Sequence, residues 1–190
     1  ILDQPSGLDL EVIIVDGLST DKTASVVAEY IPKLEARGIR TRFISEKDRG
    51  QSDAINKGSR LATGQLLTYL NSDDYYQPNV LGRVIEAFEQ NPQVRWGFGG
   101  WRFVNEAGQL YSIGQPKRFS RRRLSTVCTI VQPSCFYLKD FYFEVGAINE
   151  SLHYGMDYDL WLRMSARTEP MVLQLVISNA RYHAAAKSST

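Results

Sequence analysis

Two adjacent carboxylates follow an apolar run in the middle of the chain. Asp73 and Asp74 come shortly after residues 66–70, a stretch typical of a buried strand. In an open α/β sheet, ligands bind in the crevice beyond the carboxyl ends of the strands. Paired acids there can hold a hard divalent cation through oxygen, with substrate phosphates completing the coordination shell. The alternative is a solvated turn, because Asn, Ser and Asp favour turns by themselves.

A third acid ends an earlier apolar run. Asp16 follows residues 10–15, and Gly17 permits a tight turn beside it. A carboxylate at a strand end can accept hydrogen bonds from the ribose or base of a nucleotide. The alternative is an acidic turn in which Ser19 or Thr20 caps the next helix, and we expect that capping in either case.

A fourth acid heads a helical pattern near the end of the chain. Four residues recur at the spacing of one helix face: Asp157, Leu160, Trp161 and Met164. We therefore expect Asp157 to point into a cleft rather than into bulk water. Asp159 lies off this face and is placed to pair with Arg163 on the surface. The alternative is that Asp157 only caps its helix.

The elements that must position these acids alternate between strand and helix. Strands are expected at 10–15, 40–45 and 66–70, and a helical pattern follows each of them. The helices after the second and third strands are expected at 52–62 and 79–90. This order predicts an α/β fold with a mostly parallel central sheet flanked by helices and right-handed crossovers.

After Pro92 the pattern becomes irregular. Further elements are expected as strands at 94–104 and 134–138, a hairpin turn at 105–108 and a helix at 158–167. We predict one domain over residues 1–190, with a Rossmann-like nucleotide-binding half at 1–92 and an irregular half at 93–190.

Composition supports one globular domain. The chain has 190 residues, of which 43% are hydrophobic and 23% charged, and this suits a single well-buried core. A net charge of +1 argues against a nucleic-acid surface. Two cysteines without metal-like spacing favour a reduced, cytoplasmic setting. The chain opens on Ile1 rather than Met, as a fragment or the ordered part of a longer protein would.

Five segments, in this order and spacing, resemble family 2 glycosyltransferases: Ile13-Ile-Val-Asp-Gly-Leu-Ser-Thr-Asp-Lys-Thr23, Asp48-Arg-Gly-Gln-Ser-Asp-Ala-Ile-Asn-Lys-Gly58, Leu70-Asn-Ser-Asp-Asp74, Gln132-Pro-Ser-Cys-Phe136, and Asn149-Glu-Ser-Leu-His-Tyr-Gly-Met-Asp-Tyr-Asp-Leu-Trp-Leu-Arg163. The resemblance implies a glycosyltransferase-A fold and the inverting transfer of a sugar from a nucleotide-sugar, expected to be a UDP-sugar, to an acceptor hydroxyl. It implies Mg²⁺ or Mn²⁺ as cofactor and a role in cell-surface polysaccharide or glycolipid synthesis.

The same resemblance assigns roles by position. Residues expected to contact the donor are Asp16, Asp53, Asp73, Arg181 and Lys187. Metal ligands are expected at Asp74 and His183. Asp157 corresponds to the catalytic base, and the acceptor side is expected at Gln132 and Trp161, within the second half of the chain.

Two departures from the family accompany these matches. The family has a further strand upstream that carries part of the base pocket, and this sequence shows no counterpart of it. The family's usual Glu before the base is Met156 here, so one acidic neighbour of Asp157 is absent. The rival functions are a nucleotidyltransferase and a non-catalytic sugar- or partner-binding module on the same fold.

A basic stretch at 117–123, from Lys117 to Arg123, lies outside all of these motifs. Such a run is usually a solvated loop. Its alternative role is contact with an anionic lipid surface or a diphospho-lipid acceptor, which would place a cytoplasmic protein peripherally at the inner membrane face.

Overall fold

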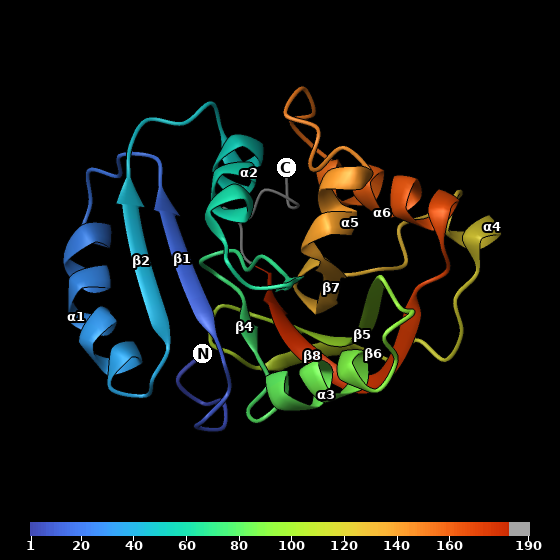
Figure 1. Ribbon diagram of the computed structural model, residues 1–190, viewed down its shortest axis with the longest axis horizontal. Helices are drawn as coiled ribbons and strands as arrows, with labels where there is room; N and C mark the ends of the chain where they lie inside the picture. The colour runs from blue at the N-terminus through green and yellow to red at the C-terminus, as the bar shows by residue number, and fades with distance from the viewer. Residues whose placement is uncertain (183–190) are drawn as a thin grey trace.

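The computed structural model describes residues 1–182, which form two β-sheets with helices packed around them (Figure 1). The smaller sheet pairs β1 (Glu11–Asp16) in parallel with β2 (Arg40–Ser45). Helix α1 (Thr23–Glu35) connects these strands and lies beside β2. The expected positions of both strands are confirmed, with β1 displaced by one residue.

The larger sheet has six strands. Its order is β3 (Leu66–Leu67), β7 (Cys135–Leu138), β5 (Trp96–Val104), β8 (Met171–Arg181) and β4 (Tyr75–Tyr76), with β6 (Leu110–Gly114) also paired to β5. The remaining helices are α2 (Gln51–Leu61), α3 (Leu81–Glu89), α4 (Arg121–Leu124), α5 (Lys139–Glu144) and α6 (Met156–Arg167), with a 3₁₀ turn at Gln132–Ser134.

The predicted α/β class is confirmed, but the expectation of a mostly parallel sheet was wrong for the larger sheet. There, β5 and β8 run parallel, whereas the other pairings are antiparallel. The antiparallel pairings arise from the second half of the chain. Instead of a further crossover, β5 turns back into β6 through a hairpin in which Gly108 adopts a φ of +77°.

Two strand edges face a large cavity. Within residues 1–182, β1 pairs with β2 alone and β3 pairs with β7 alone, so each leaves one edge without a strand partner. A cavity of about 1840 Å³ extends between them and is lined by apolar side chains that include Ile13, Leu67 and Val84. Its polar end contains three of the acids singled out above, Asp73, Asp74 and Asp157.

Two apolar clusters hold the elements that surround this cavity. One packs α6 and α5 against β7 and β5, and it includes Leu160, Trp161 and Met164, all fully buried. The other packs α3 against β8, around Val84 and Ile177. The inward-facing stripe predicted for α6 is therefore confirmed. No helix in the described part of the chain is long and apolar enough to cross a membrane.

Buried Asn56 ties α2 to the segment that follows α5. Its Nδ2 donates to the Ile148 carbonyl and to Glu150 Oε1, both at 2.9 Å. Its Oδ1 accepts from the Tyr142 hydroxyl at 2.5 Å and from the Ile148 amide at 3.3 Å. One amide side chain thus fixes α2 against the half of the molecule that carries α6.

Replacing Asn56 with alanine should lower the free energy of unfolding by about 2–4 kcal/mol, because it leaves several buried polar groups without partners. Urea unfolding measures this loss, and the matched control is Gln93→Ala at an exposed position. Equal stability of the two variants would show that water replaces the Asn56 contacts without cost.

Candidate active site

The carboxylate pair lies at the polar end of the cavity. Strand β3 stops at Leu67, earlier than the predicted strand, and the chain then runs along the cavity wall to Asp73 and Asp74. Strand β4 follows at once and pairs antiparallel with the end of β8, with Tyr75 opposite Asn179. The expected crevice position of both acids is confirmed.

Asp74 is held by the backbone of a distant strand. Its Oδ1 accepts a hydrogen bond from the Arg181 amide at 2.9 Å, and its Oδ2 is 3.4 Å from Asn71 Nδ2. Burial raises the pKa of Asp74 to about 6, and the charge of Asp73 adds to the rise, although the Arg181 amide opposes it. An ionised Asp74 is therefore costly until a positive charge arrives.

Asp157 lines the same cavity from the start of α6. The helix begins after Gly155, which takes a left-handed φ of +65°, so the N-cap position belongs to Gly155 and the alternative of Asp157 as the cap was wrong. The Asp157 Oδ1 accepts from the Tyr158 amide at 2.9 Å. Asp159 instead pairs with Arg163 at 2.7 Å, as predicted.

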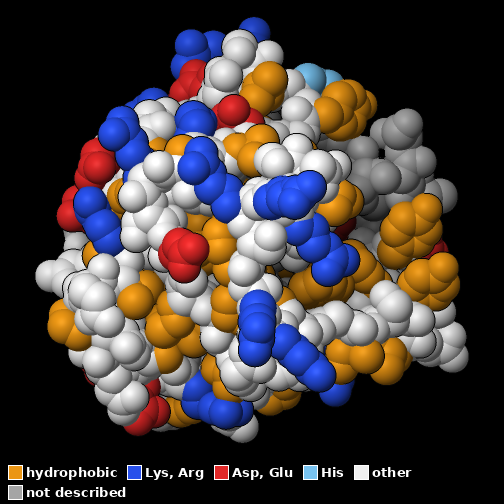
Figure 2. All heavy atoms as spheres, turned by 90° about the vertical axis from the view of Figure 1, so that its right-hand side faces the viewer, with side chains coloured by type: hydrophobic (Ala, Val, Ile, Leu, Met, Phe, Trp, Pro, Cys, Tyr) orange, Lys and Arg blue, Asp and Glu red, His pale blue; other side chains and the backbone are white. Residues whose placement is uncertain are grey.

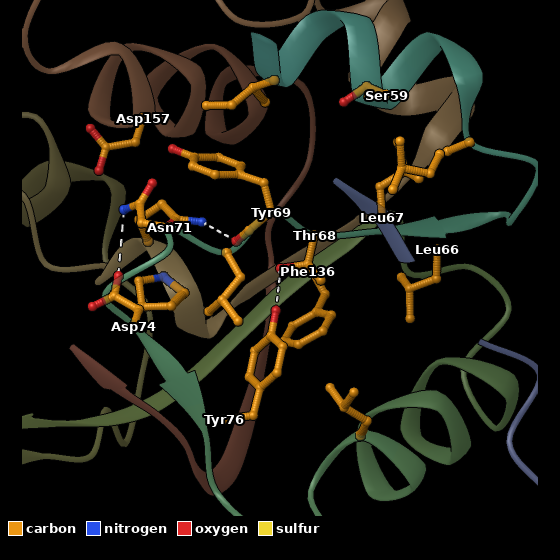
Figure 3. A pocket seen from close by; sticks show the side chains of 18 of the residues that line it. Ser59, Leu66, Leu67, Thr68, Tyr69, Asn71, Asp74, Tyr76, Phe136 and Asp157 are labelled. Atoms are coloured by element: carbon orange, nitrogen blue, oxygen red, sulfur yellow. Dashed lines mark hydrogen bonds between the residues drawn. The ribbon is translucent and has the colours of Figure 1, made fainter. Parts of the chain in front are cut away.

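Tyr69 connects the two acidic positions, and sequence reasoning missed it. Burial raises the pKa of the Tyr69 phenol, and the charges of Asp157 and Asp74 raise it further, so this ring lies close to both acids. Figure 3 shows Asn71 between Asp157 and Asp74, and the Tyr69 ring beside them with its hydroxyl directed toward Asp157. Asn71 also accepts from Gln51 of α2 at 2.8 Å. The sequence could have pointed to Tyr69 and Asn71, because they lie in the same short segment as Asp73 and Asp74.

Of the two residues expected on the acceptor side, one faces the cavity. Gln132 donates from Nε2 to the Tyr69 carbonyl at 2.5 Å, and its Oε1 is buried with no hydrogen-bond partner within the described chain. Trp161 is fully buried and stacked on Trp96 with ring centroids 6.2 Å apart. Its position in the core gives it no surface for direct contact with an acceptor, so its role is to support α6.

Arg181 brings a cation to the carboxylate pair. It ends β8 and lines the cavity, with its guanidinium 5.7 Å from the centre of the Tyr75 ring. Its Nε is buried and finds no hydrogen-bond partner among residues 1–182. The predicted contacts His183 and Lys187 lie outside the described residues.

Asp16 is fixed by its own protein neighbours. It ends β1, almost fully buried, and accepts from the Ser19 hydroxyl and from the Ser45 hydroxyl at 2.7 Å. These hydrogen bonds, that of Ser19 foremost, lower the pKa of Asp16. Ser19 therefore does not cap α1, contrary to expectation, and no side chain fills that role at the N-cap, Lys22. Asp16 is not among the side chains that line the cavity.

Asp53 is likewise occupied by the protein. Its carboxylate accepts from the Arg49 amide and guanidinium, both at 3.0 Å, and lies 3.5 Å from Lys57 Nζ. The Arg49 guanidinium lowers the pKa of Asp53 to about 2. Asp53 does not line the cavity. The structure thus assigns it to the start of α2, and direct donor contact stays a prediction.

The carboxylate pair fits a divalent cation that it shares with a ligand. No group of three or more His, Cys, Asp or Glu side chains capable of holding a metal occurs in residues 1–182. Two carboxylates, one of them desolvated and beside a like charge, suit Mg²⁺ or Mn²⁺ whose other ligands are water and phosphate oxygens.

A proton and a divalent cation should compete for Asp74. Because its pKa is raised to about 6, the cost of its buried charge is present above pH 6 and disappears as the pH falls below about 4. A carboxyl ¹³C titration without metal should show a midpoint near pH 6, and saturating Mg²⁺ should move that midpoint to lower pH. A midpoint that Mg²⁺ leaves unchanged would remove Asp74 from the metal site.

The fold is the glycosyltransferase-A fold of its structural neighbours. The chain belongs to glycosyl transferase family 2, whose sequence model matches residues 1–146. The expected family and fold are confirmed.

The relatives agree with this assignment. The chain is 30% identical to a chondroitin synthase of Escherichia coli over 158 residues, which is 83% of this chain and 22% of that protein. Its fold matches that of TarS from S. aureus, solved in complex with UDP, with a TM-score of 0.68, 18% identity and coverage of 96% of this chain and 54% of the other. A mannosyltransferase from Pyrobaculum calidifontis, solved with GDP-Man and Mn²⁺, gives a TM-score of 0.63 at 16% identity and covers 90% and 47%. The chain thus spans about half or less of these proteins.

Proposed function

We propose that this domain transfers a sugar from a UDP-sugar to an acceptor hydroxyl with inversion at the anomeric carbon, using Mg²⁺ or Mn²⁺. One observation carries the proposal. The pair Asp73 and Asp74 and the separate acid Asp157 reach one cavity from elements more than eighty positions apart in sequence, and Tyr69 lies close to both. A pair of acids that would bind the metal and a separate acid that would act as base, all lining one space, suit in-line displacement.

On the donor side, Asp73 and Asp74 would hold the cation that neutralises the diphosphate as it leaves. The Arg181 guanidinium, which has a buried Nε without a partner in the described chain, would donate to phosphate oxygens. Asp16 would receive the uridine, and His183 and Lys187 would close over the diphosphate. UDP is favoured because the TarS domain with the same fold was solved with UDP and with UDP-GlcNAc.

On the acceptor side, Asp157 would act as the general base. Its carboxylate would take the proton of the acceptor hydroxyl as the oxygen attacks the anomeric carbon from the face opposite the nucleotide. The bond to the diphosphate then breaks, and its electron pair leaves with UDP. The Oε1 of Gln132, which has no hydrogen-bond partner within residues 1–182, would accept a hydrogen bond from another hydroxyl of the acceptor and orient it.

The biological product would be a cell-surface polysaccharide or a glycolipid. Support comes from the chondroitin synthase relative, which assembles a polysaccharide according to its name. We also propose a cytoplasmic location, because nucleotide-sugars are made in the cytoplasm.

A thermal-shift screen of UDP-, GDP- and dTDP-sugars with and without Mn²⁺ tests the donor, because a ligand that binds only the folded state raises the unfolding temperature. We expect the largest shift with UDP and Mn²⁺ together. Release of UDP in the presence of sugar acceptors then separates an enzyme from a binding module on the same fold. A larger shift with GDP-sugars, or shifts that do not depend on Mn²⁺, would overturn the proposed donor chemistry.

A further inference from the structure

A cluster of cationic side chains, none of which lines the cavity, occupies one face of the molecule. Five side chains in and beside α4 are exposed: Lys117, Arg118, Arg121, Arg122 and Arg123. None of them makes an ion pair within residues 1–182, although seven other Lys and Arg residues do. Figure 2 shows Lys and Arg side chains gathered across this face, to which α4 belongs. We call these five residues the basic cluster.

The basic cluster rests on a rigid base. Phe119 turns inward and packs edge-on against Trp96, with ring centroids 6.1 Å apart, and Leu124 is fully buried. The Tyr158 hydroxyl donates to the Leu124 carbonyl at 2.5 Å. The Ser120 hydroxyl accepts from the Arg123 amide at 3.3 Å and caps the turn. The apolar and capping residues thus fix the backbone, so the cations project outward from a preformed surface.

The basic cluster adjoins the acceptor side of the cavity. From α4 the chain passes Val127, which is 51% exposed, and reaches the cavity wall at Cys128. Burial raises the pKa of the Cys128 thiol, and the charge of Asp157 raises it further. This part of the wall therefore lies near the proposed base. Tyr158, which holds α4, is the next residue after Asp157. A surface that binds the cluster would therefore lie beside this cavity wall, on the side where the proposed function places the acceptor.

We propose that the basic cluster binds an anionic phospholipid surface. Guanidinium groups donate in pairs to phosphate oxygens, and exposed Val127 can enter the headgroup layer beside them. A nucleic acid fits less well, because Phe119 is the sole aromatic residue in 117–127 and it is packed inside, which leaves no exposed ring for base stacking. The net charge of +1 makes the attraction local to this face.

Vesicle co-sedimentation tests the proposal with the 190-residue chain. Vesicles of phosphatidylcholine with phosphatidylglycerol should bind it, phosphatidylcholine alone should not, and added salt should release it. The variant Arg121→Gln/Arg122→Gln/Arg123→Gln should partition into anionic vesicles about a hundredfold less. The charge-matched control is Lys22→Gln/Arg42→Gln/Arg83→Gln, at exposed positions outside the cluster, and it should bind like the parent.

Three results would overturn the proposal: no binding to anionic vesicles, an equal loss in the control variant, or equally strong binding to soluble polyglutamate, which would indicate an acidic protein partner instead. Inorganic phosphate at matched ionic strength should not compete, since a lipid surface offers many phosphates at once. Unchanged UDP-induced thermal shifts in the cluster variant exclude misfolding, and retained binding by the corresponding Arg→Lys variant would support a role of charge.

Discussion

Asp157→Asn should lower kcat by about 10²–10⁴-fold, the usual contribution of a positioned general base. An amide cannot take the proton of the acceptor hydroxyl at neutral pH. Stability should change little, because the Asn Oδ1 can still accept from the Tyr158 amide and because Asp157 is not the N-cap of α6. UDP affinity should also be preserved, since the carboxylate pair at 73–74 lies on another segment.

The matched control is Asp159→Asn, which makes the same chemical change two residues away. Asp159 pairs with Arg163, which also donates to the Ala147 carbonyl at 2.7 Å, so this control should cost some stability and little kcat. Steady-state kinetics and UDP titration on both variants decide whether Asp157 or Asp159 is the base. If Asp159→Asn were the inactive variant and Asp157→Asn turned over normally, the base would be Asp159.

Asp74→Asn should weaken Mn²⁺-dependent binding of UDP by at least about tenfold, equivalent to about 1.4 kcal/mol. A neutral amide is a poorer ligand for a hard cation than a carboxylate. The fold should remain intact or gain stability, because Asn removes a buried charge whose pKa is raised to about 6 and keeps an oxygen for the Arg181 amide.

Calorimetric UDP titration with Mn²⁺ and with EDTA measures this effect. Asp140→Asn is the control, since Asp140 is an exposed acid on α5 that pairs with Arg95 at 3.1 Å. The Asp74 variant should bind UDP equally weakly under both conditions, whereas the control should retain its Mn²⁺ dependence. An Asp74 variant that keeps the full Mn²⁺ dependence would place the metal elsewhere.

Local sequence patterns predicted the elements of the first half and the positions of the site acids. The apolar run before Asp16, the run before Asp73 and the helical stripe after Asp157 each depend on neighbours within about eight residues, which is the range over which periodicity acts. All three patterns gave elements at the expected places, although the third strand ended early at Leu67.

Long-range pairing was not predictable in the same way. The parallel contact of β5 with β8 joins segments about seventy-five residues apart, and no local signal specifies it. The same limit applies to individual acids. The partner of Asp16 at Ser45 lies 29 positions away, and Arg49, which holds Asp53, also contacts Glu150 across 101 positions. Whether an acid faces ligand or protein depends on such distant partners.

Among residues 1–182, β1 and β3 each leave one edge without a strand partner, which has a consequence for handling this chain in solution. An exposed strand edge is a template on which another chain can add, and proteins that leave one open tend to aggregate or exchange strands. Charged side chains on a strand oppose such additions, but the part of β1 after Glu11 offers only Val12, Ile13, Ile14 and Val15 before Asp16. Self-association through β1 is therefore the first form of instability to look for as the protein is concentrated.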